Sequence, residues 1–239
     1  MTTTLTYKAI SDVGCVRKNN EDMAYAAGRL VRDCYVKGST EGTCAFAVAD
    51  GMGGYEGGDV ASEIVCRSFN AFMSGLLFES DSQIINDIKD WACEANNLVL
   101  ETAWLRPELS EMGTTFVGLI FAGKKMWLIN IGDSRCYRIR GGILKQLSTD
   151  HSERNRTGNP DTPSNLIYNY IGNIPEDFFS DISEYVPIEG DTYLLCSDGL
   201  SDMISDDAIE ENAGSVERLV ELAKEAGGID NITVVKVEL

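Results

Sequence analysis

Residues 44–54 read CAFAVADGMGG and decide much of the interpretation of this chain. The six residues from Cys44 to Ala49 are all apolar, which predicts a strand that is buried on both faces. Asp50 ends this strand, and the glycines at positions 51, 53 and 54 predict a tight turn directly after it. The stretch therefore places a carboxylate where a buried strand reaches the rim of its sheet.

An acidic residue beside a glycine, at the end or the start of an apolar strand, recurs along the chain. LINIGD ends at Asp133, YLLCSDG contains Asp198, and GGIDNITVV contains Asp230. A separate acidic pair, Glu21-Asp22, lies in NNED just before residues 23–26. One Asp-Gly pair alone is typical of a turn. Several carboxylates that meet at a sheet rim, however, repel one another unless a cation binds there. Since the ligands would all be oxygens, we expect Mg²⁺ or Mn²⁺ rather than zinc or copper.

The remaining apolar patterns predict several strands and helices around these motifs. Three- and four-residue spacing predicts a long helix from about Asp59 to Phe72 and a second from Ile84 to Val99. Residues 152–165 are polar and aperiodic, which predicts a surface loop. Further strands are expected at 4–10, 114–121, 125–131, 134–140, 182–186, 192–196 and 231–237, and shorter helices at 206–212 and 215–226.

The order of these elements indicates the fold class. Strands, two helices, a run of strands, then helices and a final strand do not alternate as in a parallel doubly wound sheet. Helices packed over antiparallel sheets fit this order better, so we expect an α+β fold. No repeat, low-complexity tract or linker divides the sequence, which predicts a single domain over residues 1–239.

Composition excludes several classes of function. The chain has 239 residues with 20 Lys and Arg against 38 Asp and Glu, a net charge of −18, so neither nucleic acid nor an anionic membrane is an expected partner. The sequence shows no signal peptide and no apolar run long enough to span a membrane. Seven cysteines without a CxxC pair indicate reduced thiols and a cytoplasmic location. His151 is the single histidine, which excludes a site built on two imidazoles.

Taken together, seven motifs resemble those of the PPM (PP2C-type) metal-dependent serine/threonine protein phosphatases, in the order and near the spacing of that family. The resemblance covers nearly the whole chain. It implies a four-layer αββα sandwich in which helices flank two packed antiparallel sheets. It also implies hydrolysis of phosphoserine and phosphothreonine by a water that bridges two metal ions. The motifs are RKNNED (17–22), DGMGG (50–54), GTT (113–115), IGDSR (131–135), DHS (150–152), SDGL (197–200) and DN (230–231).

The resemblance also implies roles for single residues. Asp50 would bridge two Mn²⁺ or Mg²⁺ ions. Asp198 and Asp230 would complete the first site, while Glu21 and the Gly51 carbonyl would hold the second. Such an arrangement suits phosphate esters, because two metals can activate a water and neutralise the phosphoryl oxygens.

Four further residues have more qualified roles. Arg17 would bind the substrate phosphate, and Asp22 would orient waters without contacting the metal itself. Asp133 would join Asp198 in a third metal site as in bacterial members of the family. Asp202 is a weaker candidate for that site, since it could equally cap the short helix that follows.

Two departures from the family pattern leave alternatives open. Met52 stands where many eukaryotic members have histidine, and a thioether cannot donate a proton, so a water or His151 is left as the general acid. A structural role for His151 is the preferred interpretation. The second departure is residues 152–173, where the flap-like segment of the family looks short and contains Pro160 and Pro163.

The resemblance further implies a monomer that acts on phosphorylated proteins, the targets of a serine/threonine kinase. Two other functions stay open. One is a binding module that recognises phosphoproteins without hydrolysing them, although such modules usually lose a metal ligand and Asp50, Asp198 and Asp230 are all present. The other is a metal-dependent phosphatase for small phosphomonoesters, because the motifs concern only the phosphate end of the substrate.

Overall fold

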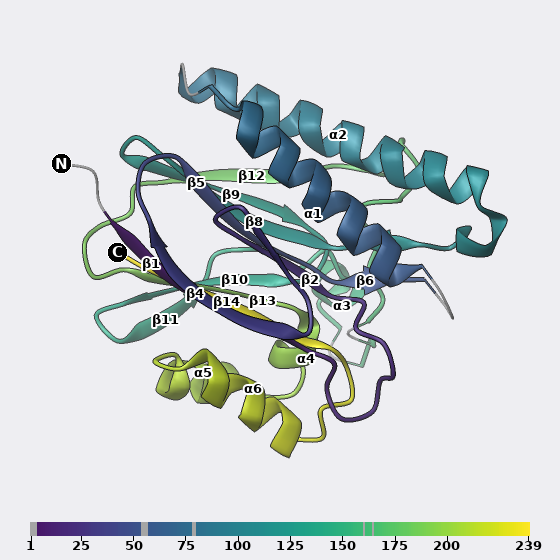
Figure 1. Ribbon diagram of the computed structural model, residues 1–239. Helices are drawn as coiled ribbons and strands as arrows, with labels where there is room; N and C mark the ends of the chain where they lie inside the picture. Colours follow the sequence, from purple (N-terminus) through teal and green to yellow (C-terminus); the bar gives the residue numbers. More distant parts are fainter. Residues whose placement is uncertain (1–3, 54–56, 78–79, 160, 164) are drawn as a thin grey trace.

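Two six-stranded antiparallel sheets form the centre of the protein in the computed structural model (Figure 1). The structure describes residues 4–53, 57–77, 80–159, 161–163 and 165–239, so Gly54 and Pro160 of the motifs above lie outside the described residues. The first sheet has the order β11 (Ile143–Gln146), β10 (Arg135–Arg140), β13 (Thr192–Cys196), β14 (Ile232–Glu238), β1 (Leu5–Asp12) and β4 (Cys34–Thr40). The second has the order β12 (Asp181–Tyr185), β9 (Lys125–Ile131), β8 (Phe116–Ala122), β5 (Cys44–Ala49), β2 (Met23–Ala26) and β3 (Arg29–Val31).

Helices cover the outer face of each sheet (Figure 1). The long helices α1 (Gly58–Gly75) and α2 (Asp81–Leu105) lie on the second sheet, and α2 is followed by a 3₁₀ turn at Pro107–Leu109. On the opposite side α4 (Asp198–Ser201), α5 (Asp206–Asn212) and α6 (Val216–Glu225) pack on the first sheet. The expected α+β architecture with four layers, helix–sheet–sheet–helix, is confirmed.

Three apolar layers hold this sandwich together, because each sheet buries both faces. Between the sheets, Phe46 packs against Tyr7 with ring centroids 5.4 Å apart. Between the second sheet and its helices, Phe69 contacts Trp91 and Phe116 at 4.9 and 5.0 Å. Strands β5 and β8 lie in the middle of the second sheet, and every residue of them is buried. A strand that is covered on both faces in this way requires a continuous apolar sequence.

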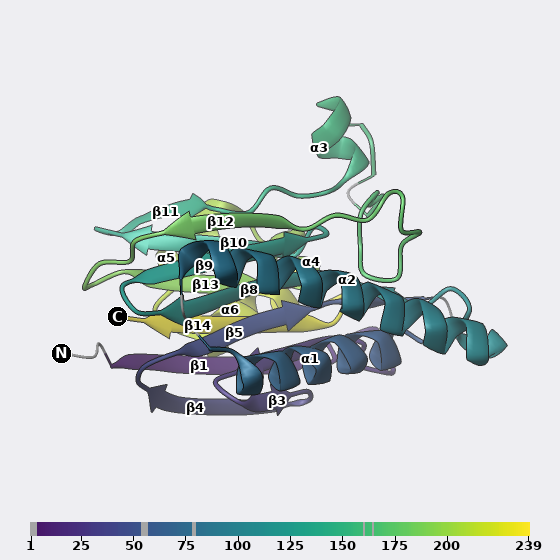
Figure 2. The same ribbon diagram turned by 90° about the horizontal axis from the view of Figure 1, so that it is seen from above.

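Some elements were not predicted from the sequence. The edge strand β4 was missed because no residue of it is fully buried, so its sequence has no apolar alternation. Within the expected loop at 152–165 the structure has a short helix, α3 (Glu153–Thr157), which stands away from the layers in Figure 2. The prediction of a loop throughout was wrong because a helix of five residues is too short to show a period.

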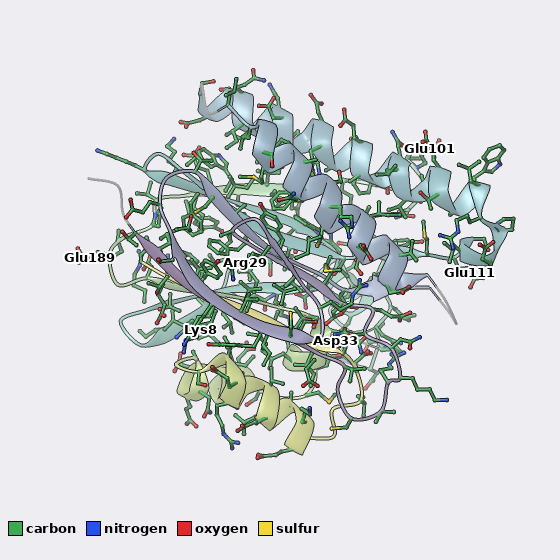
Figure 3. The ribbon with its side chains drawn as sticks, in the orientation of Figure 1. Lys8, Arg29, Asp33, Glu101, Glu111 and Glu189 are labelled. Carbon is green, nitrogen blue, oxygen red and sulfur yellow. The ribbon has the colours of Figure 1, made fainter. Side chains whose placement is uncertain are left out.

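Other sequence expectations concern the surface and the thiols. All seven cysteines are free in the structure. The charged side chains of Glu101 and Glu189 lie at the periphery of the layers (Figure 3). No helix among the described residues combines the length and the apolar character that crossing a membrane requires.

Candidate active site

The carboxylates that end or begin strands meet in one cavity at the rim of both sheets, with a volume of about 330 Å³. Asp50 follows β5, while Asp133 follows β9 of the same sheet. Asp198 follows β13 and Asp230 precedes β14 in the other sheet. The complete lining is Arg17, Glu21, Asp50, Gly51, Met52, Gly53, Thr115, Asp133, Asn165, Ile167, Asp198 and Asp230. The structure thus brings every predicted site residue to one cavity, except Asp22 and the weaker candidate Asp202.

Asp50 is fixed in this cavity through its backbone. Its N–H donates to Thr115 Oγ1 at 3.0 Å, and its carbonyl accepts from the Thr115 N–H at 2.9 Å and from Thr114 Oγ1 at 2.8 Å. Thr115 Oγ1 also lies 2.7 Å from Ser134 Oγ. The GTT motif therefore positions Asp50 without using its carboxylate, which stays available for a ligand.

Asp22 lies behind the cavity and not in its wall, because only 1% of its surface is exposed. Its Oδ2 accepts from Ser197 Oγ at 2.7 Å, and Ser197 Oγ accepts in turn from the Thr233 N–H at 3.0 Å. Its Oδ1 is buried and has no hydrogen-bond partner within the described part of the chain. A buried oxygen of this kind requires a water or a cation to satisfy it.

Asn231 is a site residue to which the sequence analysis gave no role. Its Oδ1 accepts from the Glu21 N–H at 2.8 Å, and its Nδ2 donates to the carbonyls of Val13 and Asn19, both at 3.0 Å. It therefore joins the segment that carries Glu21 to the segment that carries Asp230. Its place directly after Asp230 in the DN motif was the only signal for it in the sequence.

Arg17 reaches the cavity but contacts a carboxylate there. Its Nη2 lies 2.7 Å from Asp230 Oδ2, and about half of the Arg17 side chain is exposed. The guanidinium thus offsets part of the negative charge of the cavity while keeping contact with solvent. A planar fork of donors at this place can exchange a carboxylate for a phosphate, because both present oxygen pairs of similar geometry.

Burial and mutual repulsion raise the pKa values of these carboxyl groups. Burial is the largest cause in each case, and neighbouring negative charges add to it. The pKa is raised to about 8 for Asp133, to about 7 for Asp22 and to about 6 for Asp198. The pKa of Asp50 is raised well above its ordinary value by burial, with Asp22, Asp198 and Asp133 among the further causes. The cavity therefore holds more carboxylates than it can ionise without a cation.

A hard divalent cation suits this cavity, since the available donors are carboxylate and carbonyl oxygens. As they stand, the described residues form no group of three or more His, Cys, Asp or Glu side chains that could already hold a metal ion. Three observations fit a metal ion at this place: the oxygen donors that line the cavity, the raised pKa values of its carboxyl groups, and the buried Asp22 Oδ1 without a hydrogen-bond partner among the described residues.

The melting temperature of the metal-free protein is expected to fall as the pH rises from about 5 to about 8. Asp side chains in the unfolded chain release their protons near pH 4, whereas folded Asp22, Asp133 and Asp198 retain theirs to about pH 6–8. The stability from these protonated groups is present at low pH and is lost as the pH passes their folded pKa values. Thermal denaturation in EDTA and in Mn²⁺ tests this, and Mn²⁺ should stabilise most at pH 8. A metal-free melting temperature that rises across this range would contradict it.

The structure also places three residues whose roles the sequence left open. His151 is buried and outside the cavity lining, so the preferred structural interpretation fits and a role as proton donor does not. Met52 lines the cavity. Asp202 stands at the C-terminal end of α4, and the residue that caps α5 is Ser205, so the idea that Asp202 caps the following helix was wrong.

Comparison with known proteins identifies the class to which this fold and cavity belong. The family model described as "Protein phosphatase 2C" matches residues 22–231. The chain therefore belongs to the protein phosphatase 2C family, and the resemblance seen in the motifs is confirmed.

Individual members of the family agree with this assignment. Serine/threonine protein phosphatase PstP of Mycobacterium tuberculosis is 35% identical over 267 residues, which cover 100% of this chain and 46% of PstP. Protein phosphatase PhpP of Streptococcus pneumoniae is 31% identical over 252 residues, 96% of each protein. The crystal structure of the PstP catalytic domain in complex with 2 manganese ions has a TM-score of 0.82, 32% identity and 99% coverage of both chains. The present chain thus spans about half the length of PstP.

Proposed function

We propose that this chain is a metal-dependent protein serine/threonine phosphatase that hydrolyses phosphoserine and phosphothreonine. The observation that carries this proposal is the single cavity in which five carboxylates from both sheets surround one half-exposed arginine. A phosphate needs positive charge to bind, and carboxylates alone would repel it. Cations that bind to these carboxylates, together with Arg17, reverse the sign of the cavity.

The residues proposed to hold the metals are those that the family resemblance implies, and all of them line the cavity. Asp50 would serve two Mn²⁺ or Mg²⁺ ions, with Asp198 and Asp230 for the first and Glu21 with the Gly51 carbonyl for the second. Asp133 with Asp198 offers a third position. When bound, two such ions lower the pKa of the water between them and offset the charge of the phosphoryl oxygens. The manganese ions of the PstP catalytic domain support this assignment.

The chain's own side chains bind and orient the reactants in this proposal. Arg17 releases Asp230 to a cation and turns its guanidinium to the substrate phosphate. Asp22, held by Ser197, keeps its second oxygen free to orient a water at the back of the cavity. Because Met52 cannot donate a proton and His151 lies outside the cavity, protonation of the leaving alkoxide falls to a water molecule.

Wider properties of the protein belong to the same proposal. We infer that residues 1–239 form a single domain and that the protein is a monomer. We further infer that its substrates are proteins phosphorylated by a serine/threonine kinase. The seven free thiols support a location in the reducing cytoplasm. The net charge of −18 disfavours nucleic acid as a partner.

The direct test is hydrolysis of a phosphothreonine peptide by the purified protein, with added Mn²⁺ and with EDTA. We expect turnover in Mn²⁺ and loss of turnover in EDTA, restored when Mn²⁺ is returned in excess. A small aryl phosphate measured in parallel distinguishes a protein phosphatase, which has the higher kcat/KM on the peptide, from an enzyme of small esters. Metal binding by calorimetry without any turnover would indicate a binding module and contradict the proposal.

A further inference from the structure

His151 occupies the point where the flap segment (residues 152–173) leaves the body of the protein and returns to it. Its backbone N–H donates to the Gly132 carbonyl at 2.9 Å, and its carbonyl accepts from the Tyr168 N–H at 3.0 Å. The next residue, Ser152, forms a β-bridge with Ile167. The start of the flap, at residues 151–152, is therefore tied to residues 167–168 of the same segment, beside the loop that carries Asp133.

The imidazole makes a second set of connections, and its surroundings fix its tautomer. Nδ1 lies 3.1 Å from the Gly132 amide nitrogen and 2.9 Å from Asn169 Nδ2. A backbone N–H can only donate, so Nδ1 carries the lone pair and the proton of the neutral ring is on Nε2. Nε2 lies 3.1 Å from Asp181 Oδ2 in β12 and donates to it. The Asn169 amide is oriented independently, because it donates to the Phe179 carbonyl at 2.8 Å and accepts from the Phe179 N–H at 3.3 Å.

These contacts link two parts of the cavity wall, the loop that carries Asp133 and the flap. Gly132 directly precedes Asp133, which lines the cavity, and the flap contributes Asn165 and Ile167 to the same lining. Only 1% of His151 is exposed, and its ring also packs against Phe179 with centroids 4.8 Å apart. A shift of this ring would therefore move the Asp133 loop and the flap relative to each other.

We propose that His151 is a positioning residue that sets the distance between Asp133 and the substrate-facing flap through the Nδ1 bonds to Gly132 and Asn169. The proposal rests on the function inferred above, since it concerns the wall of the same cavity. His151 neither touches the substrate nor transfers a proton. Its effect on catalysis comes from where it holds Asp133 and the flap.

Two substitutions separate the two ring nitrogens. His151→Asn retains an acceptor oxygen near the place of Nδ1, whereas His151→Gln places its amide near Nε2 and leaves the Gly132 N–H without an acceptor. Asp181→Asn is the matched control, because it alters only the Nε2 contact and the Asp181 side chain is 55% exposed. If Nδ1 carries the function, His151→Asn and Asp181→Asn should resemble the unmodified protein, and His151→Gln should not.

The first readout is amide hydrogen exchange at Gly132 by NMR in the metal-free protein. Exchange should be on the order of tenfold faster in His151→Gln and within about twofold of the unmodified rate in His151→Asn, as loss of one hydrogen bond predicts. Unchanged exchange at Gly132 in His151→Gln would overturn the proposed link. Should His151→Gln fail to fold, Asn169→Ala cuts the flap side of the link and should leave the Gly132 amide protected.

The second readout is steady-state kinetics with Mn²⁺ on a phosphothreonine peptide and on a small aryl phosphate. We expect His151→Gln to raise the KM for the peptide roughly three- to tenfold and to change the KM for the small ester by less than about twofold, because a peptide would extend from the cavity along the flap beyond Asn165 and Ile167, whereas a small ester would stay within the cavity. Equal losses on both esters in both His151 variants would mean that the ring only fills space. Absence of turnover in the unmodified protein would instead overturn the proposed function and with it the catalytic role, while the exchange result would stand separately.

Discussion

Asp198→Asn is expected to lower metal-dependent turnover on a phosphothreonine peptide by roughly 10³-fold, because several kcal/mol of transition-state stabilisation depend on the metal ligands. The amide keeps one oxygen but loses the negative charge that holds a divalent ion. The fold should persist, since the Asp198 side chain begins α4 at the surface of the cavity and packs into no apolar layer. Steady-state assays across a Mn²⁺ titration give the measurement.

The same variant carries a second signature that distinguishes a lost ligand from a damaged fold. Burial and the neighbouring Asp230 raise the pKa of Asp198 to about 6, so its charge is unfavourable in the metal-free protein at about pH 7.5. Removing that charge should raise the metal-free melting temperature and reduce the stabilisation that Mn²⁺ provides. Asp207→Asn is the matched control, because it removes one charge from the exposed start of α5 and should leave turnover unchanged. Unaltered activity in Asp198→Asn would contradict the assigned role.

Gly51→Ala is expected to lower both stability and activity, because the position has no room for a methyl group. An added Cβ would overlap the carbonyl of Gly58 at the start of α1 and the carbonyl oxygen of Glu21. Overpacking of this kind costs about 1–3 kcal/mol, which corresponds to a fall of roughly 2–10 °C in melting temperature for a chain of this size. Displacing the Glu21 segment should also lower turnover by about 10²-fold, as misplacement by an ångström typically does.

Gly75→Ala provides the comparison for this substitution. Gly75 ends α1, and an added Cβ there would meet no atom within 4 Å. Since alanine favours a helix over glycine, this variant should be neutral or more stable by up to about 1 kcal/mol. Calorimetric melting of both variants, with activity in Mn²⁺, tests the pair. Equal melting temperatures in the two variants would show that the backbone around Gly51 yields easily and that the predicted close contact is unimportant.

Much of the fold followed from local pattern. Strand β5 was predicted because a short, continuous apolar run is typical of a strand that is covered on both faces. Strands β8 and β9 were predicted as two strands joined by the short link at residues 122–124. The helices α1 and α2 were predicted because each presents a long periodic apolar face to the second sheet. Edge strand β4 and helix α3 were missed because exposed or very short elements leave no such pattern.

The sequence by itself predicted the kind of chemistry at the site and the charged residues that line the cavity. Carboxylates at strand ends, beside glycines and without partner histidines, predict a hard cation from residue type alone. The order of these motifs, which resembles that of a known family, then predicted the sandwich fold, and the two packed sheets of the structure confirm it. Neither inference needed a distance between residues.

Only the tertiary structure decided how the site is held and where its charges are paired. Arg17 and Asp230 are 213 positions apart in the chain yet form an ion pair at 2.7 Å. Asn231 bonds to the amide of Glu21 across 210 positions, and His151 joins Gly132 to the flap. Such contacts depend on how two sheets from distant parts of the chain meet at one rim. Residue type and local spacing do not encode that meeting, because it is the packing of the apolar layers between and outside the sheets that sets it.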